Sequence, residues 1–290
     1  MFETIGTVCS GVIVSILLLA AASVHAQESE LAALINEYRS APQTCEGKSY
    51  SPAGPLAPSD ALASVNVEPG ASLENALQGA GYQAARVQTI TVSGLTSARG
   101  VMAFIRKRYC SQLLSRRYAE IGVSRKGSVW QILLAQPLLS PELGDWKEAG
   151  MRVHELVNDA RSEPRSCGGK KFAAAPPLDW NAKLAAAALA HSRDMAKQDY
   201  FSHVAPEGGE VGDRASRQSY AWRRIGENIA NEQGSPQRVV AGWLASPNHC
   251  ANIMNADFVE MGAAYAVNHK SEGTIYWTQV LATPKSSGVR

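Results

Sequence analysis

Apolar residues at three- and four-residue spacing predict three helices in the second half of the chain. The first runs from Trp146 to Arg161 and ends before Pro164. A second, rich in alanine and leucine, covers Asn181 to Lys197, and a third begins at Ser235-Pro236 and continues through Leu244. This spacing places the apolar side chains on one face of each helix, where they can pack against a core. Proline suits the first turn of the third helix because its missing N–H would be unpaired there anyway.

Two strands are predicted after these helices. Apolar and polar residues alternate, with many β-branched and aromatic side chains, over Phe258 to Val267 and Gly273 to Ala282. The short polar connection Asn268–Glu272 is typical of an antiparallel hairpin. Helices that come early and strands that come late favour an α+β layered fold over a parallel doubly wound sheet.

The chain contains an internal repeat. Twelve of 32 positions are identical between residues 31–62 and residues 153–184, at a constant offset of 122. The match resumes at a new offset of 139, where Gln88 aligns with Glu227 and Phe104 with Trp243. The difference, 139 minus 122, indicates that the first copy lacks 17 residues. A period this long indicates tandem whole domains rather than a solenoid.

The N-terminal segment is predicted to be a secretory signal peptide. A run of apolar or small residues, Gly11–Ala22, precedes the small-x-small sequence Val24-His25-Ala26. The run is too short for a typical transmembrane helix. No Lys or Arg precedes it, so a retained N-terminal anchor is the alternative. The mature protein is then expected to start near Gln27, without a stable membrane span, in an extracellular or periplasmic location.

Length and charge fit this division. The 290 residues are divided into a signal peptide (1–26), a first domain (27–139) and a second domain (140–290), joined near Pro137 to Asp145. The 28 Lys and Arg against 26 Asp and Glu give a net charge of +2. Because no basic field results, nucleic acid is not an expected partner.

The cysteines follow the repeat. Four remain after the signal peptide and Cys9 are removed, two at equivalent places in each copy. An even number in an exported chain implies disulfides. Three connectivities are open, of which a duplication preserves the pairing within each copy, Cys45–Cys110 and Cys167–Cys250.

Polar motifs in the second copy resemble a known family. In order, they are Phe201-Ser202-His203, Gly226-Glu227-Asn228-Ile229, a Trp243-to-Met254 segment that contains Ser246 and His249, Phe258-to-Gly262, and Tyr276-Trp277-Thr278-Gln279. Together they resemble the CAP superfamily of cysteine-rich secretory, antigen 5 and pathogenesis-related proteins, in its bacterial SCP-domain form. The resemblance implies an α–β–α sandwich in each copy, the first being degenerate.

The resemblance also implies a central cavity lined by His203, Glu227 and His249. Ser246 stands where many family members have a second glutamate, and whether Glu260 contributes stays open. Two imidazoles and a carboxylate are ligands that a labile Zn²⁺ site uses, so His203 and His249 are candidate metal ligands. The alternative is structural, with Glu227 accepting hydrogen bonds from both histidines. His191 is expected to be a core histidine, and His154 a surface one.

Two function classes follow. The first is a non-enzymatic binding module for a small apolar ligand or a cell-envelope component. The second is a zinc-dependent hydrolase or protease with Glu227 as general base. No H-E-x-x-H motif is present, and no nucleophile elbow surrounds Ser202 or Ser246, so binding is favoured over catalysis.

The first copy lacks the candidate site. Gln88 replaces Glu227, Tyr109 replaces His249, and the segment of His203 is deleted. Glu120 persists at the place of Glu260, which suggests a structural role for that glutamate. The first domain could cover the cavity of the second or bind a partner.

Overall fold

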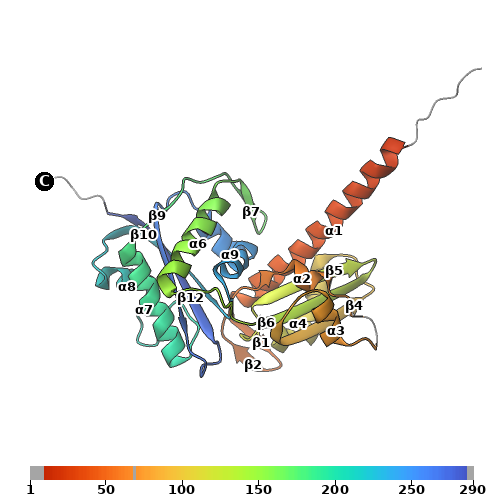
Figure 1. Ribbon diagram of the computed structural model, residues 1–290, viewed down its shortest axis with the longest axis horizontal. Helices are drawn as coiled ribbons and strands as arrows, with labels where there is room; N and C mark the ends of the chain where they lie inside the picture. The colour runs from red at the N-terminus through yellow and green to blue at the C-terminus, as the bar shows by residue number, and fades with distance from the viewer. Residues whose placement is uncertain (1–9, 68–69, 286–290) are drawn as a thin grey trace, which may run out of the picture.

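Two four-stranded sheets, one in each half of the chain, organise the structure (Figure 1). The computed structural model describes residues 10–67 and 70–285, with side chains from residue 25 onward. In chain order, the first half contains α1 (Ser10–Arg39), β1 (Gln43–Cys45), β2 (Lys48–Tyr50), β3 (Ala57–Pro58), α2 (Asp60–Ser64), α3 (Leu73–Gly79), β4 (Ala84–Ser93), α4 (Ala98–Arg108), α5 (Cys110–Leu113), β5 (Glu120–Lys126) and β6 (Val129–Pro137). The second half contains α6 (Trp146–Arg161), β7 (Arg165–Cys167), β8 (Lys170–Phe172), β9 (Asp179–Trp180), α7 (Ala182–Gln198), α8 (Val211–Arg217), β10 (Trp222–Asn231), α9 (Pro236–Ala245), α10 (Pro247–Ile253), β11 (Glu260–Val267) and β12 (Ile275–Pro284).

The two sheets have the same strand order. The order is β4-β6-β5-β3 in the first half and β10-β12-β11-β9 in the second. In both, the long strands are antiparallel and the two-residue edge strand is parallel to its neighbour. Each half also has a short hairpin, β1-β2 or β7-β8.

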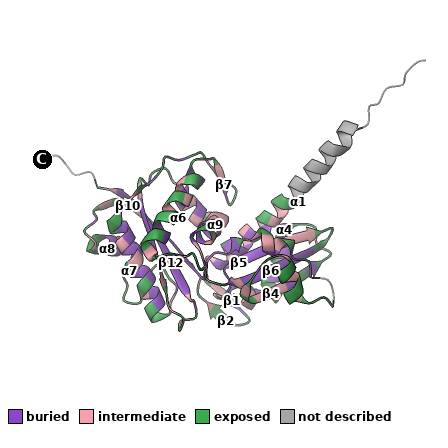
Figure 2. Ribbon diagram, in the orientation of Figure 1, coloured by how far each residue is buried: buried purple, intermediate pink, exposed green. Residues whose placement is uncertain are grey.

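Helices cover both faces of each sheet. In the second half, α6 and α9 enclose a core around Trp243 and Trp277, while α7 and α8 pack on the other face around Leu184 and Val280. In the first half, α1 and α4 cover one face, and the shorter α2 and α3 cover the other. The central strands β6 and β12 are accordingly almost entirely buried (Figure 2). The predicted α+β fold with α–β–α layers is confirmed.

Local signals explain the predicted helix boundaries. Asp145 and Glu148 form a capping box at the start of α6, and Asn181 caps α7. Ser235 caps α9, with Pro236 in its first turn. The three predicted helices are confirmed. The strands are slightly displaced, since β11 begins at Glu260 and β12 ends at Pro284.

Two arginines at equivalent positions donate hydrogen bonds to equivalent loops in the two halves. Arg39 and Arg161, 122 positions apart, are both fully buried. Arg39 donates to the carbonyl oxygens of Gly54, Leu113, Ser115 and Tyr118. Arg161 donates to those of Pro176, Ile253, Asn255 and Phe258. Each guanidinium thus satisfies several loop carbonyls that would otherwise be buried without a partner.

The strand register corrects part of the internal alignment. Val129–Pro137 pairs with β4, and Tyr276–Pro284 pairs with β10. When these two segments are aligned at their constant offset, Thr89 rather than Gln88 occupies the place of Glu227. The same shift of one residue holds in the next helix. There Ile105 is fully buried like Trp243, whereas Phe104 is 37% exposed. The alignment was wrong here because the second copy has two more residues than the first between the buried helix residue and the next cysteine, seven positions from Trp243 to Cys250 against five from Ile105 to Cys110.

Both expected disulfides are present. Cys45 joins Cys110 and Cys167 joins Cys250, with Cα atoms 5.8 and 5.5 Å apart. Each bridge ties a short hairpin, β1-β2 or β7-β8, to the helix that follows α4 or α9.

Four consecutive residues, from the last residue of β10 onward, form the junction between the halves. Asn231 Nδ2 donates to the Arg116 carbonyl at 2.7 Å, and Gln233 Nε2 donates to the Pro55 carbonyl at 2.6 Å. Glu232 accepts a hydrogen bond from Gln136 at 2.8 Å, and the Gly234 carbonyl accepts one from Ser140 N. Packing is also close, because a Cβ at Gly54 would lie 2.4 Å from Asn231 Oδ1. The junction, residues 231–234, therefore fixes both the first half and the linker against β10.

Helix α1 passes without a break through the predicted cleavage point at residue 26. Cys9 and the start of the predicted signal peptide lie outside the described residues. Among the helices of the described part of the chain, none combines the length and the apolar character needed to cross a membrane. The signal peptide stays a prediction, as do the domain limits at 139 and 140, which fall between β6 and α6.

Candidate functional site

Glu227 stands at the centre of the site, on strand β10. Its side chain is only 2% exposed, yet both carboxylate oxygens have partners. His203 Nδ1 lies 2.9 Å from Oε1, and Arg214 Nη2 donates to Oε2 at 2.7 Å. His203 is 54% exposed and marks the mouth of the site, whereas Arg214, 5% exposed, closes its base. The predicted contact between His203 and Glu227 is thus present in the structure.

Arg214 is the residue that the motifs did not reveal. It lies on helix α8, where Nη1 donates to the Gly209 carbonyl and Nη2 also donates to that of His203. Two buried ions in direct contact compensate each other's loss of hydration only if further hydrogen bonds complete the arrangement. The sequence offered only a general signal, namely that a buried carboxylate needs a cation among the nearby arginines.

His191 adds a third nitrogen-bearing side chain around Glu227. Its Nε2 donates to the Ser202 carbonyl at 3.0 Å and lies 3.8 Å from Glu227 Oε1. The side chain is fully buried on α7, as expected for a core histidine. His191 therefore positions the Ser202–His203 loop while it faces the carboxylate.

Opposing effects set the protonation of this cluster. Burial alone would raise the pKa of Glu227, but the hydrogen bond from His203 and the charges of His191, Arg214 and His203 hold it below its ordinary value. Burial lowers the pKa of His191, against the opposing attraction of Glu227. The predominant state at neutral pH is a Glu227 carboxylate paired with the Arg214 cation, beside a neutral His191.

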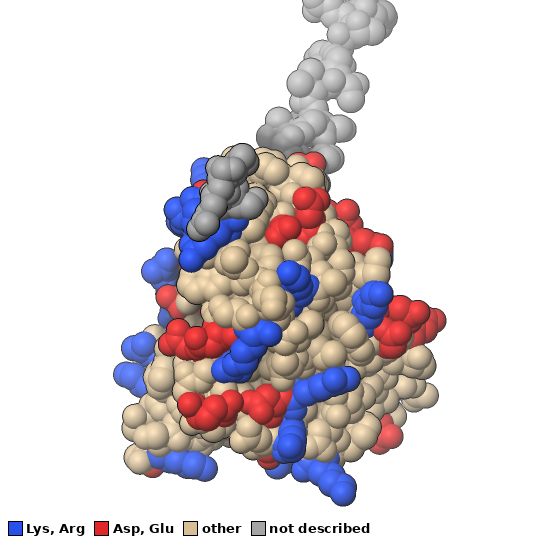
Figure 3. Space-filling model, turned by 90° about the vertical axis from the view of Figure 1, so that its left-hand side faces the viewer, with Lys and Arg blue, Asp and Glu red and all other residues tan. Residues whose placement is uncertain are grey.

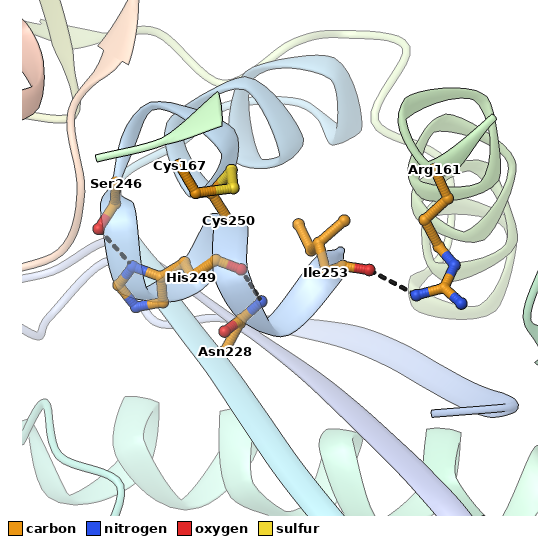
Figure 4. Close-up of a disulfide and its surroundings, with 7 residues drawn as sticks. All are labelled: Arg161, Cys167, Asn228, Ser246, His249, Cys250 and Ile253. Carbon is orange, nitrogen blue, oxygen red and sulfur yellow. Dashed lines mark hydrogen bonds between the residues drawn. A yellow bond between two sulfur atoms is a disulfide. The ribbon is translucent and has the colours of Figure 1, made fainter. Parts of the chain in front are cut away.

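His249 does not contact Glu227, contrary to the structural alternative derived from the sequence. Its Nδ1 lies 2.8 Å from Ser246 Oγ, and its carbonyl accepts from Asn228 Nδ2 at 3.2 Å (Figure 4). Asn228 lies within β10 and ties that strand to α10. His249 does not reach the carboxylate because Arg214 occupies the second oxygen of Glu227, while His249 pairs with the Ser246 hydroxyl.

A cavity of about 220 Å³ joins these residues. Its walls are Phe201, Ser202, His203, Glu227, Ile229, Asn248, His249 and Asn252 of the second half, with Ser40, Pro52 and Ala53 of the first. We call it the His/Glu pocket. It brings His203, Glu227 and His249 together, and the first half supplies part of its wall.

Glu260 lies outside this pocket. It accepts a hydrogen bond from Tyr220, just as Glu120 accepts one from Tyr82 in the first half. The repeated pair supports a structural role for the glutamate. His154 is also not a plain surface residue, because its Nε2 is 2.6 Å from the Leu178 carbonyl in a half-buried position.

The donor set does not fit a resident metal ion. Among the residues that the structure describes, no group of three His, Cys, Asp or Glu side chains is arranged to hold one. The Glu227 carboxylate faces the Arg214 guanidinium, which would repel a cation, and only His203 and His249 remain as ligands. We therefore assign no step to zinc.

The geometry does not favour a serine nucleophile. Ser246 and His249 are within hydrogen-bonding distance, but the Ser246 side chain is buried, at 1% exposure. Burial lowers the pKa of His249 to about 3, which makes the ring a weak base at neutral pH. Ser202 Oγ instead accepts a hydrogen bond from Val204 N.

The lowered pKa of His249 predicts a measurable pH dependence. Below pH ~6.5 the unfolded chain binds a proton at this residue that the folded chain does not, so stability falls as the pH falls toward about 3. The His249→Gln variant should lose less stability than the wild type between pH 7 and 5, by up to about 2 kcal/mol. Urea denaturation at both pH values measures this, with His269→Gln, an exposed histidine, as control. Parallel pH curves for His249→Gln and the wild type would contradict it.

Surface charge near the C-terminal end of the molecule is mixed. In Figure 3, basic and acidic side chains alternate over the visible face and form no continuous field of one sign. This pattern agrees with the near-neutral charge of the whole chain.

The segment that contains most of this site is similar to known proteins. The sequence model of the cysteine-rich secretory protein family, CAP, matches residues 154–281. In Bacillus subtilis (strain 168), "Uncharacterized protein YkwD" is 36% identical over 128 residues, 44% of each chain. "Uncharacterized membrane protein YlbC" of the same organism is 35% identical over 85 residues, 29% of this chain and 25% of that protein. The chain thus spans less than half the length of these relatives.

A solved structure gives a weaker likeness. It is an extracellular protein containing a SCP domain from Bacillus anthracis str. Ames, 26% identical, with a TM-score of 0.40 over 53% of this chain and 52% of that one. The family match covers every residue of the second-half wall of the His/Glu pocket. Residues 154–281 of the chain therefore match the cysteine-rich secretory protein (CAP) family.

Proposed function

We propose that the chain is an exported, non-enzymatic binding protein whose His/Glu pocket takes a hydrogen-bonding group of a cell-envelope component. The observation that carries this proposal is the state of Glu227, whose two oxygens are engaged by His203 and Arg214. A carboxylate held in this way maintains the shape of the pocket, and its lowered pKa makes it a weak base. Export is supported by the predicted signal peptide and by two disulfides, which persist in oxidising compartments.

The pocket lining favours a polar group over a wholly apolar ligand. His203 and His249 present imidazole rings, and Asn248 and Asn252 lie beside them. Its volume of about 220 Å³ is below the ~300–1,000 Å³ typical of pockets that enclose a whole small molecule. A terminal sugar or peptide group of a larger envelope polymer suits these dimensions.

Co-sedimentation with purified bacterial cell-wall sacculi tests the proposal. We expect the wild type to sediment with the sacculi, and His203→Ala and His249→Ala each to weaken binding about tenfold through the loss of one hydrogen-bonding group. His269→Ala, outside the pocket, should bind like the wild type. Equal binding by all four proteins would refute the assignment. Zinc-dependent hydrolysis that disappears in both pocket variants would instead support the hydrolase alternative.

A further inference from the structure

A second cavity, of about 520 Å³, lies between the two halves and shares no residue with the His/Glu pocket. Helix α1, the start of α2 and strand β5 of the first half form one side. Helix α9, the start of α10 and the β7-β8 hairpin of the second half form the other. We call it the inter-half groove. Its volume falls within the range of cavities that hold small molecules.

The walls of the inter-half groove are mainly small and aliphatic. The apolar residues are Ala32 and Ala33 of α1, Ala63 of α2, Ile121 and Val123 of β5, and Ala241, Leu244 and Ala245 of α9. Alanines leave room where larger side chains would let the two halves close together. Such a lining suits an aliphatic chain, because apolar surface gains free energy when it leaves water.

One cation stands in the groove without a carboxylate. Arg165, on strand β7, has a buried Nε with no hydrogen-bond partner, and its side chain makes no salt bridge with any residue that the structure describes. A buried donor without a partner is costly, and a charged one more so. An anionic group placed in the groove would give Arg165 the partner it lacks.

The other charged groups of the groove are already engaged or lie at its rim. Glu28 Oε2 lies 3.0 Å from His25 Nδ1. Asp60 is exposed in the first turn of α2, where the helix dipole favours a negative charge. His25 is the one lining residue before the predicted cleavage site. Arg165 is therefore the cation left to recognise an anion.

The backbone that carries Arg165 is also held in place. The disulfide between Cys167 and Cys250 joins its hairpin to α10. Gly168 follows with a φ of +58°, and a Cβ there would meet Pro247 at 2.6 Å, so the hairpin turn is pressed against the start of α10. A preorganised cation loses less conformational freedom when a ligand binds.

We propose that the inter-half groove binds an anionic amphiphile, with its aliphatic chain between α1 and α9 and its carboxylate or phosphate on Arg165. The site lies outside the His/Glu pocket and is independent of the function proposed above. Eleven of its 18 lining residues belong to the first half of the chain, beyond the region that matches the CAP family.

Isothermal titration calorimetry with twelve-carbon probes tests this inference, each probe kept below its micellar concentration. We expect binding of dodecanoate or dodecyl phosphate, at least tenfold weaker binding of dodecanol, and none of dodecylammonium. The comparison of the first two probes distinguishes a fatty carboxylate from a phosphate ester as the preferred source of the anion.

Variants locate the site. Arg165→Gln should weaken binding of the preferred anion about tenfold and bring it to the level of dodecanol, while Lys171→Gln, an exposed charge on the same hairpin, should not change it. Ala33→Phe should fill the groove and abolish binding, with an unchanged circular dichroism spectrum. His203→Ala should bind the probe normally, so failure of the His/Glu proposal is recognised separately. The inference is overturned if neither anion binds, or if Arg165→Gln and Lys171→Gln bind it equally.

Discussion

Replacement of Arg214 by methionine is expected to lower the free energy of unfolding by about 3–5 kcal/mol, the usual cost of leaving one member of a buried ion pair without its partner. Methionine retains much of the length of the side chain but cannot donate to Glu227, Gly209 or His203. The carboxylate would then remain 2% exposed with His203 as its one close hydrogen-bond donor. Urea denaturation followed by circular dichroism measures the loss.

Two controls separate this effect from a general one. Arg217→Met removes an exposed arginine from the same helix and should change stability by less than about 0.5 kcal/mol. The double variant Arg214→Met with Glu227→Gln should recover a large part of the loss, because the amide carries no charge that must be compensated. If Arg214→Met is no less stable than Arg217→Met, the ion pair is not what stabilises this region.

The same variant should change the acid response. Glu227 has a lowered pKa in the folded protein, so its contribution to stability is present above the pKa of the unfolded chain and is lost as the pH falls through the folded value. Without Arg214, one cause of that lowered pKa disappears. The stability of the variant should therefore depend less on pH in the acidic range, at a lower overall level.

Removal of the second disulfide, by Cys167→Ser with Cys250→Ser, should cost about 4 kcal/mol. The bridge closes a separation of 83 residues, and a loop of this length constrains the unfolded chain strongly in the chain-entropy description. Denaturant unfolding under oxidising conditions gives the value for the variant and the wild type. Addition of a reductant should lower the free energy of unfolding of the wild type more than that of the variant, because the variant keeps only the Cys45–Cys110 bridge.

The first disulfide provides the matched comparison. Cys45→Ser with Cys110→Ser removes a bridge across 65 residues, so the expected loss is nearly the same. Only the second bridge also fixes α10, which carries His249, and the hairpin that carries Arg165. We therefore expect both pairs of variants to lose stability, and only the second pair to weaken both proposed binding sites. Equal binding by the two pairs would show that the bridge does not position these sites.

Regular helices and disulfides were accessible from the sequence because their signals are local or repeated. The apolar stripe and the Asp145 cap define α6, and the duplicated cysteines indicate the pairing. The contact between His203 and Glu227 was accessible only through motif resemblance, since 24 positions separate the two residues.

Other features depend on tertiary geometry. Arg214 is one of several arginines between the motifs, and only the docking of α8 on β10 selects it as the partner of Glu227. The alignment placed Gln88 opposite Glu227 because a length difference of two residues before the second cysteine of each copy leaves little trace in a short match. The contribution of Ser40, Pro52 and Ala53 to the His/Glu pocket depends on how the two halves meet, which no local pattern encodes.

The junction at residues 231–234 has a consequence for the order of folding. Its side-chain hydrogen bonds join residues 96, 115 and 178 positions apart in the chain. Contacts of such long range form late, because the intervening chain must first be ordered. The first half therefore leaves the ribosome well before its docking surface exists. During that interval the alanine face of α1 stays uncovered, and the docking of α9 and α10 then covers part of it.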